Sequence, residues 1–174
     1  MPTDSLFDVA MDGIFKWEGG LSDHPKDPGG ITKYGICLRS YPRLGREGII
    51  ALTKDAAKEI YRKDYWPTVP EWLQDTHCAT CIVLMDCAVN QGTSFARKAL
   101  QRACGAADDG IIGPETKRKA LAVPDIELAN RLCVQRALHY ARLRTFDTFG
   151  KGWMNRLFDV HATATLYACY TVIK

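Results

Sequence analysis

An almost unbroken series of helical patterns, interrupted once, is the feature that most constrains how this chain can fold. Apolar residues recur at helical spacing along most of the 174 residues. The interruption is the segment 20–36, which is rich in Gly, Pro, Asp and Ser and therefore favours turns or a short, irregular β-ribbon. The pattern predicts a mainly α (α+β) fold in which one small ribbon stands beside helices.

The helix before this interruption is predicted over residues 6–17. Phe7, Met11 and Ile14 fall on one face at helical spacing. Gly19-Gly20 follows, and glycines commonly end a helix. The chain therefore enters the ribbon directly from the end of an amphipathic helix.

The later helices are marked by their start and stop residues. Thr53 is a good N-cap for the next clear helix, which Pro67 ends. Residues 76–90 carry apolar side chains nearly all round, so we expect this helix to be central and buried. A further helix closes at Gly105, a short one begins at Pro114, and two long helices are predicted from about Asp125 to Arg144 and from about Lys151 to Ile173.

Seven cysteines, an odd number, indicate reduced thiols rather than a disulfide framework. Cys78 and Cys81, with His77 before them and Cys87 after, have a spacing that zinc ligands also use. No second CxxC pair follows at finger spacing, and positions 78 and 81 share a helical face with Met85. We therefore expect core cysteines and no metal site.

Charge and hydropathy limit the partners of the chain. The net charge of +3 suits weak attraction to an anionic polymer, but it is also ordinary for a soluble protein. No run of about 18 apolar residues occurs, so we expect no integral membrane segment. The first residues lack the basic and apolar regions of a signal peptide. The basic run at 117–119 is either a solvated face or an aid to holding an anionic wall.

Glu18 is the first candidate for chemistry. It continues the apolar stripe of the first helix and lies in its last turn. Desolvation and the negative end of the helix dipole both disfavour the anion and would raise its pKa. A Glu kept protonated near neutral pH can protonate the leaving oxygen of a glycosidic bond. A solvated residue at a helix end is the alternative that spacing alone leaves open.

A second carboxylate lies nine residues further on, at Asp27. If the ribbon folds back so that Asp27 and Glu18 stand about 6.5–9.5 Å apart, a water fits between sugar and Asp27 and the outcome is inversion. Thr32 can hold that water by its hydroxyl. Asp27 can instead cap its own turn, and Asp23 is a competing second carboxylate.

These residues occur in a stretch that resembles the signature of glycoside hydrolase family 108, a family of N-acetylmuramidases. Their order also resembles the catalytic triad of phage-type lysozymes. The matching motifs are Glu18-Gly19-Gly20, then Asp27-Pro28-Gly29-Gly30-Ile31-Thr32, then Tyr34-Gly35-Ile36. Similar matches follow at 57–66 and 86–92, while 109–114 and 152–156 resemble the predicted peptidoglycan-binding part that usually follows.

The resemblance implies a lysozyme-like helical domain with its ribbon beside the active-site cleft. Residues 1–104 would be the catalytic part, and 105–174 a helical, peptidoglycan-binding part packed into the same globule. Glu18 carries over as general acid, with Asp27 and Thr32 orienting the water. The implied reaction is hydrolysis of the β-1,4 bond between N-acetylmuramic acid and N-acetylglucosamine, with no cofactor. Leu21 stands where the family commonly has an aromatic residue, which puts a stacking contact in doubt.

Four further residues are candidates for binding the sugar chain. Asn90 can donate to a sugar acetamide or cap the end of its helix. Tyr34, Tyr65 and Trp66 can stack on sugar faces, although aromatic residues at helical spacing are more often core. Arg156, in the last helix, is expected to be a packing or capping residue.

Other functions remain open at this stage. A lytic transglycosylase would use the same acid without an Asp-held water, and a non-catalytic peptidoglycan-binding module would use Glu18 only structurally. A helical nucleic-acid-binding protein would use the basic run, and we expect no nucleic acid. We expect a monomer that waits in the host cytoplasm until a pore releases it to the cell wall. A virion-borne or secreted effector would have the same sequence features.

Overall fold

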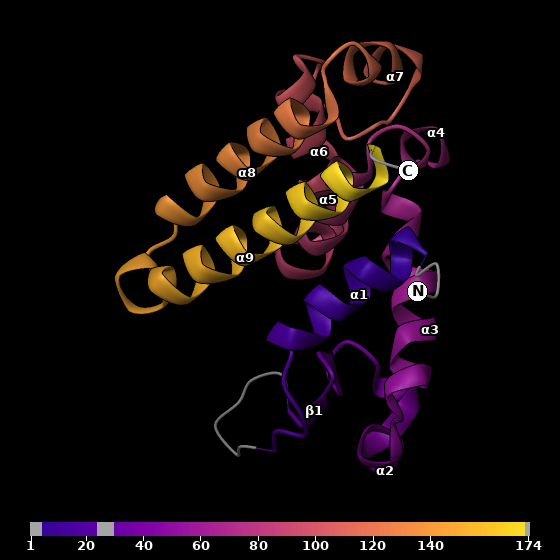
Figure 1. Cartoon of the computed structure of the whole chain (residues 1–174). Coiled ribbons are helices and arrows are strands. Elements are labelled where there is room, and N and C mark those ends of the chain that lie inside the picture. The colour runs from indigo at the N-terminus through magenta and orange to yellow at the C-terminus, as the bar shows by residue number, and fades with distance from the viewer. Residues whose placement is uncertain (1–4, 24–29, 173–174) are drawn as a thin grey trace.

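The computed structural model of the chain describes residues 5–23 and 30–172, and within them helices surround a central helix, α5 (Figure 1). A two-stranded antiparallel sheet stands at one end. The major elements are α1 (Leu6–Trp17), β1 (Thr32–Lys33), β2 (Ile36–Cys37), α2 (Gly45–Ala51), α3 (Lys54–Asp64), α5 (Cys78–Gln91), α6 (Thr93–Cys104), α7 (Pro114–Leu121), α8 (Asp125–Ala141) and α9 (Phe146–Val172). Three short elements connect them, η1 (Pro42–Leu44), η2 (Trp66–Thr68) and α4 (Glu71–Gln74). The mainly α fold with a small β-ribbon is confirmed.

Helix α1 begins and ends where the sequence predicted. Ser5 is its N-cap and forms a capping box with Asp8, which satisfies backbone donors of the first turn. Glu18 is the C-cap, and its backbone N–H donates to the carbonyl of Ile14. Since Ile14 and Met11 are fully buried, the helix is anchored on one face and delivers Glu18 at a fixed end.

Helix α5 is central, as its apolar sequence predicted. Helices α1, α6, α8 and α9 all pack against it, and residues 79–88 are buried. The packing of α8 and α9 on α5 crosses the boundary expected near residue 104. Leu128, Leu132 and Val160 belong to the same cluster of buried residues as the α5 core.

The glycine-rich stretch forms a tight hairpin. Lys33 of β1 pairs with Ile36 of β2, and the two-residue turn between them is Tyr34-Gly35. Both turn residues have positive φ, 52° and 77°, which is the backbone of the turn that suits two-residue hairpins. Ser22 and Thr32 exchange two backbone hydrogen bonds of 2.8 Å, so the chain on either side of residues 24–29 is joined.

Helix α9 begins earlier than predicted, at Phe146 rather than near Lys151. Gly150 lies buried within the helix, and a β-carbon at this position would lie 2.8 Å from the ring of Phe146. The missing side chain makes room for an aromatic ring, so here glycine extends the helix rather than ending it.

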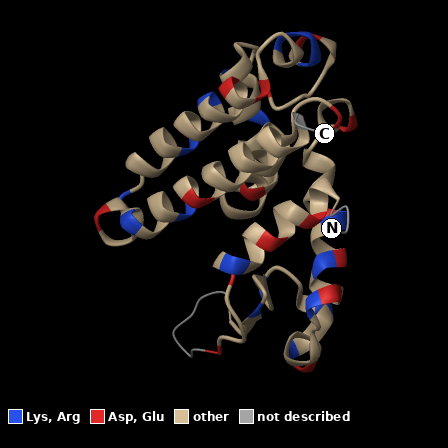
Figure 2. Cartoon of the chain, viewed as in Figure 1, with Lys and Arg blue, Asp and Glu red and all other residues tan. Residues whose placement is uncertain are grey.

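The remaining expectations concern cysteines, metals and membranes. All seven cysteines, which lie in the described ranges, are free thiols, and burial raises the pKa of Cys87 to about 12. No three His, Cys, Asp or Glu side chains of the described segments gather as metal ligands would. No helix in these segments is long and apolar enough to cross a bilayer. The basic run lies on α7 (Figure 2), where Lys119 pairs with Glu115 at the surface.

Candidate active site

Glu18 lies at the end of α1, between the hairpin and the helical body. Its side chain is 21% exposed, so the carboxylate reaches solvent from a largely enclosed position. Oxygen Oε1 accepts a hydrogen bond of 2.7 Å from Nη1 of Arg156 on α9. The other oxygen faces the hairpin. The two carboxylate oxygens therefore have different surroundings.

Gly35 lets the hairpin approach the carboxylate. A β-carbon at this position would lie 2.8 Å from Oε2 of Glu18 and would also overlap the hydroxyl of Tyr61. Any side chain at position 35 would therefore displace the carboxylate of Glu18 and the hydroxyl of Tyr61. The positive φ of Gly35 and the missing β-carbon are thus two independent reasons for glycine at this position.

Tyr61 of α3 holds the Tyr34-Gly35 turn in place. Its hydroxyl donates a 3.0 Å hydrogen bond to the carbonyl of Tyr34. Burial, together with the nearby Glu18 carboxylate, raises the pKa of Tyr61 well above its ordinary value. The hydroxyl therefore keeps its proton and remains a donor. This bond holds Tyr34 in its left-handed conformation, which a non-glycine residue adopts only with support from its surroundings.

A buried carboxylate, Asp86, lies behind Arg156. Its oxygen Oδ1 accepts from Nε and Nη2 of Arg156 at 2.9 and 2.7 Å, and Oδ2 accepts from Nη2 of Arg136 at 2.6 Å. Asp86 and Arg136 are almost completely buried. Burial alone would raise the pKa of Asp86, but the two guanidinium groups hold it below its ordinary value. Asp86 is therefore charged and fully paired.

The same chain of contacts continues to Asn90. Arg136 donates to the side-chain oxygen of Gln91 at 2.7 Å and lies 3.4 Å from the hydroxyl of Tyr140. That hydroxyl donates to Oδ1 of Asn90. The side chain of Asn90 is exposed. Because its oxygen already accepts from Tyr140, its NH2 group is the part left to donate to a ligand.

The aromatic candidates fall in separate places. Tyr34 borders a hollow of about 520 Å³ that Gly19 and Gly20 also line. Tyr65 borders a different hollow, beside Tyr41 and Asp64. Trp66 packs edge-on against Phe7, with ring centroids 5.2 Å apart. Phe7 is at the opposite end of α1 from Glu18, roughly 16 Å away at 1.5 Å per residue.

The expected partners of Glu18 in catalysis are only partly visible. Asp27 lies outside the described residues. Thr32 lies in β1, and its hydroxyl donates 3.1 Å to the carbonyl of Gly30. Asp23, the competing carboxylate, is at the surface in an ion pair with Arg46, which lowers the pKa of Asp23. Asp23 is thus already paired with a cation.

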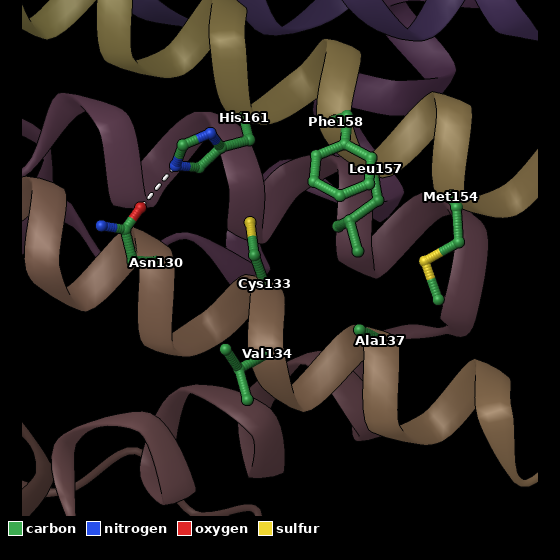
Figure 3. Close-up of a pocket in the computed structure, with 8 residues that line it drawn as sticks. All are labelled: Asn130, Cys133, Val134, Ala137, Met154, Leu157, Phe158 and His161. Atoms are coloured by element: carbon green, nitrogen blue, oxygen red, sulfur yellow. Dashed lines mark hydrogen bonds between the residues drawn. The ribbon is translucent and has the colours of Figure 1, made fainter.

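A separate hollow of about 240 Å³ lies between α8 and α9 (Figure 3). None of the described residues that line it is Asp or Glu, and it is almost wholly apolar. His161 contacts Asn130 across it. Without a carboxylate it does not fit acid-catalysed hydrolysis, so Glu18 remains the centre of the candidate site.

The residues that sequence analysis missed are those around Arg156. Arg156 was expected to pack or cap within its own helix, but it forms buried ion pairs with Glu18 and Asp86. A signal was present, because Asp86 is the one charged residue in the segment 78–91. A charge placed in a buried helix requires a partner, but the sequence does not say which of the many arginines provides it.

Comparisons with known proteins give a family and a similar structure. The family model described as glycosyl hydrolase 108 matches residues 11–92. The solved structure of SagA from Brucella abortus is similar over 93% of this chain and 95% of that one, with 36% sequence identity and a TM-score of 0.82. No curated protein sequence matches the chain. Neither the family match nor the similar structure supports a separate peptidoglycan-binding region in residues 105–174.

Proposed function

The chain belongs to the glycosyl hydrolase 108 family, and we propose that it hydrolyses bacterial peptidoglycan as an N-acetylmuramidase, with Glu18 as the general acid. The observation that carries the proposal is the setting of this carboxyl group. It stands at a helix end, mostly enclosed but open to solvent, with one oxygen hydrogen-bonded to Arg156 and the other facing Gly35, which has no side chain. A rigid, partly desolvated carboxyl is what protonation of a glycosidic oxygen requires.

The two oxygens of Glu18 have different parts in the proposed reaction. Oε1 is engaged by Arg156, so we assign the transferable proton to Oε2. That oxygen would protonate the bond between N-acetylmuramic acid and N-acetylglucosamine. When the proton leaves, Arg156 stabilises the carboxylate that remains, because its charge is already aligned with it.

We propose that Asp27 and Thr32 orient the attacking water. The ion pair between Asp23 and Arg46 supports Asp27 as the second carboxylate, because Asp23 already has a partner. The test is a matched pair of variants, Asp27→Asn and Asp23→Asn. We expect the first to abolish hydrolysis and the second to leave it within about twofold. The reverse result would move the role to Asp23.

We propose that the sugar chain binds beside Asn90 and beside the aromatic residues near the hairpin. The outward NH2 group of Asn90 would donate to the carbonyl of a sugar acetamide, while Tyr34 and Tyr65 would stack on sugar faces. Trp66, which packs on Phe7, is the third aromatic candidate. Residues 105–174 would add affinity for the wall through the basic face of α7. The enzyme would act as a monomer. It would serve phage-type lysis after release from the host cytoplasm.

The test is mass spectrometry of the soluble products released from purified peptidoglycan by wild type and by Glu18→Gln. Muropeptides with a reducing N-acetylmuramic acid, absent with the variant, are the expected result. Anhydro ends would make the protein a transglycosylase. Wall binding without any released product would make it a binding module.

A further inference from the structure

Four charged side chains from four helices form one continuous row. Glu18 contacts Arg156, Arg156 contacts Asp86, and Asp86 contacts Arg136, with nitrogen–oxygen distances of 2.6–2.9 Å. The row begins at the solvent with Glu18 and ends in the core, where Arg136 is fully buried. The two carboxylates and two guanidinium groups balance when Glu18 is ionised.

We infer that Asp86 is a positioning residue for the proposed reaction, fixing Arg156 against Glu18 and offsetting its charge. The inference rests on the proposed function, since it concerns the same site. Asp86 touches no substrate; it acts through Arg156.

The geometry of Arg156 supports the positioning role. Two of its nitrogens, Nε and Nη2, bind the same oxygen of Asp86, and the third, Nη1, is left for Glu18. A planar guanidinium held along one edge cannot rotate. Its remaining donor is therefore aimed at Oε1 of Glu18. A lysine at this position could not satisfy both carboxylates in this way.

Charge balance gives Asp86 a second effect. An arginine beside Glu18 favours the carboxylate, whereas a general acid must carry a proton before the reaction. Asp86 opposes that effect, and Arg136 in turn limits the negative charge that Asp86 adds. Asp86 and Arg136 thus have opposite effects on the charge that surrounds Glu18.

The other groups near Glu18 leave this balance unchanged. From α3, Tyr61 faces it with a neutral hydroxyl. On β2, the thiol of Cys37 donates a hydrogen bond to the hydroxyl of Ser40. At the surface, Lys16 of α1 and Asp159 of α9 pair with each other at 2.6 Å, which cancels their charges.

The experiment compares the pH dependence of kcat for wild type, Asp86→Asn and Arg136→Met. Asp86→Asn makes the surroundings of Glu18 more positive, so the protonated form is lost sooner and the alkaline limb moves to lower pH by about one unit. Arg136→Met makes them more negative, so the limb moves to higher pH. The double variant removes one charge of each sign, and its limb should return to near the wild-type position.

Two controls separate this role from a structural one. Asp108→Asn breaks an exposed ion pair with Arg102 and should leave the pH profile unchanged. In Arg136→Met, Asp86 still pairs with Arg156. This variant therefore still tests the inference if Asp86→Asn fails to fold. Thermal unfolding is measured for every variant.

Opposite shifts in the two single variants support the inference. Equal profiles, or shifts in the same direction alongside reduced stability, would overturn it and make Asp86 a purely structural residue. A wild type that releases no muropeptides would overturn the proposed function instead, which the product analysis detects on its own.

Discussion

Glu18 is bounded by two regions that hold it in different ways. On the hairpin side, contact depends on shape: a left-handed turn, an absent β-carbon at Gly35 and one hydroxyl from Tyr61. On the helical side, it depends on buried charges, Arg156 and Asp86. The difference teaches that the contact of Glu18 with the hairpin is sensitive to volume, whereas its contact with the helical body is sensitive to charge. The first three predictions test this contrast, and the fourth concerns an ion pair far from Glu18.

The largest effect is expected in the helical body. Leu132 of α8 is fully buried, and Leu132→Ala should lower the free energy of unfolding by about 2–5 kcal/mol through the cavity it leaves. Activity per folded molecule should be unchanged, because no charge pair is altered. Urea denaturation measures the loss. Leu138→Ala, on the exposed side of the same helix, is the control and should cost less than about 0.5 kcal/mol.

The next effect is expected at the turn. Gly35→Ala places a methyl group against Glu18 and Tyr61, so kcat/KM should fall about a hundredfold, or about 2.7 kcal/mol. Gly20→Ala is the matched control, since a β-carbon at Gly20 meets nothing within 4 Å. Steady-state kinetics of both variants test the claim. Wild-type activity in the Gly35→Ala variant would mean that the turn does not approach the carboxylate as described.

A smaller effect is expected for Tyr61→Phe. The ring stays in place, but the 3.0 Å bond to the Tyr34 carbonyl is lost, which should cost about 1 kcal/mol. Activity should fall severalfold because the turn is less firmly held. Tyr41→Phe loses a comparable bond, to Asp64, and should lower stability without lowering activity. Equal kinetic losses in both would remove the special role given to Tyr61.

The smallest effect is expected at the far end of α1. Hydrogen bonds from Lys58 and Ser5 hold the pKa of Asp8 to about 2. A lowered pKa adds stability above the ordinary carboxylate range near pH 4, and this stability is lost as pH falls through about 2. Asp8→Asn should therefore reduce stability at pH 7 by less than about 1 kcal/mol. Thermal melts from pH 7 to pH 2 should show the two proteins converging.

Sequence analysis anticipated the hairpin side better than the helical side, and the reason is distance along the chain. The end of α1, the turn residues and the ribbon depend on local signals, such as Gly19-Gly20 and Gly35. Arg156 is 138 residues from Glu18, and a helical pattern does not encode which partner a buried polar residue will meet. The start of α9 was missed for a different, local reason, because Gly150 makes room for the ring of Phe146 inside the helix.

The position of the two arginines also has a consequence for synthesis. Asp86 emerges from the ribosome well before Arg136 and Arg156, so the central helix must wait for its counter-ions before it can be buried at low cost. A chain stopped short of Arg156 would hold Glu18 with no cation beside it. Proteolytic or translational truncation before Arg156 should therefore inactivate the protein even when the described part of the hairpin and α1 are intact. The site is therefore complete only after Arg156 of the last helix has been synthesised.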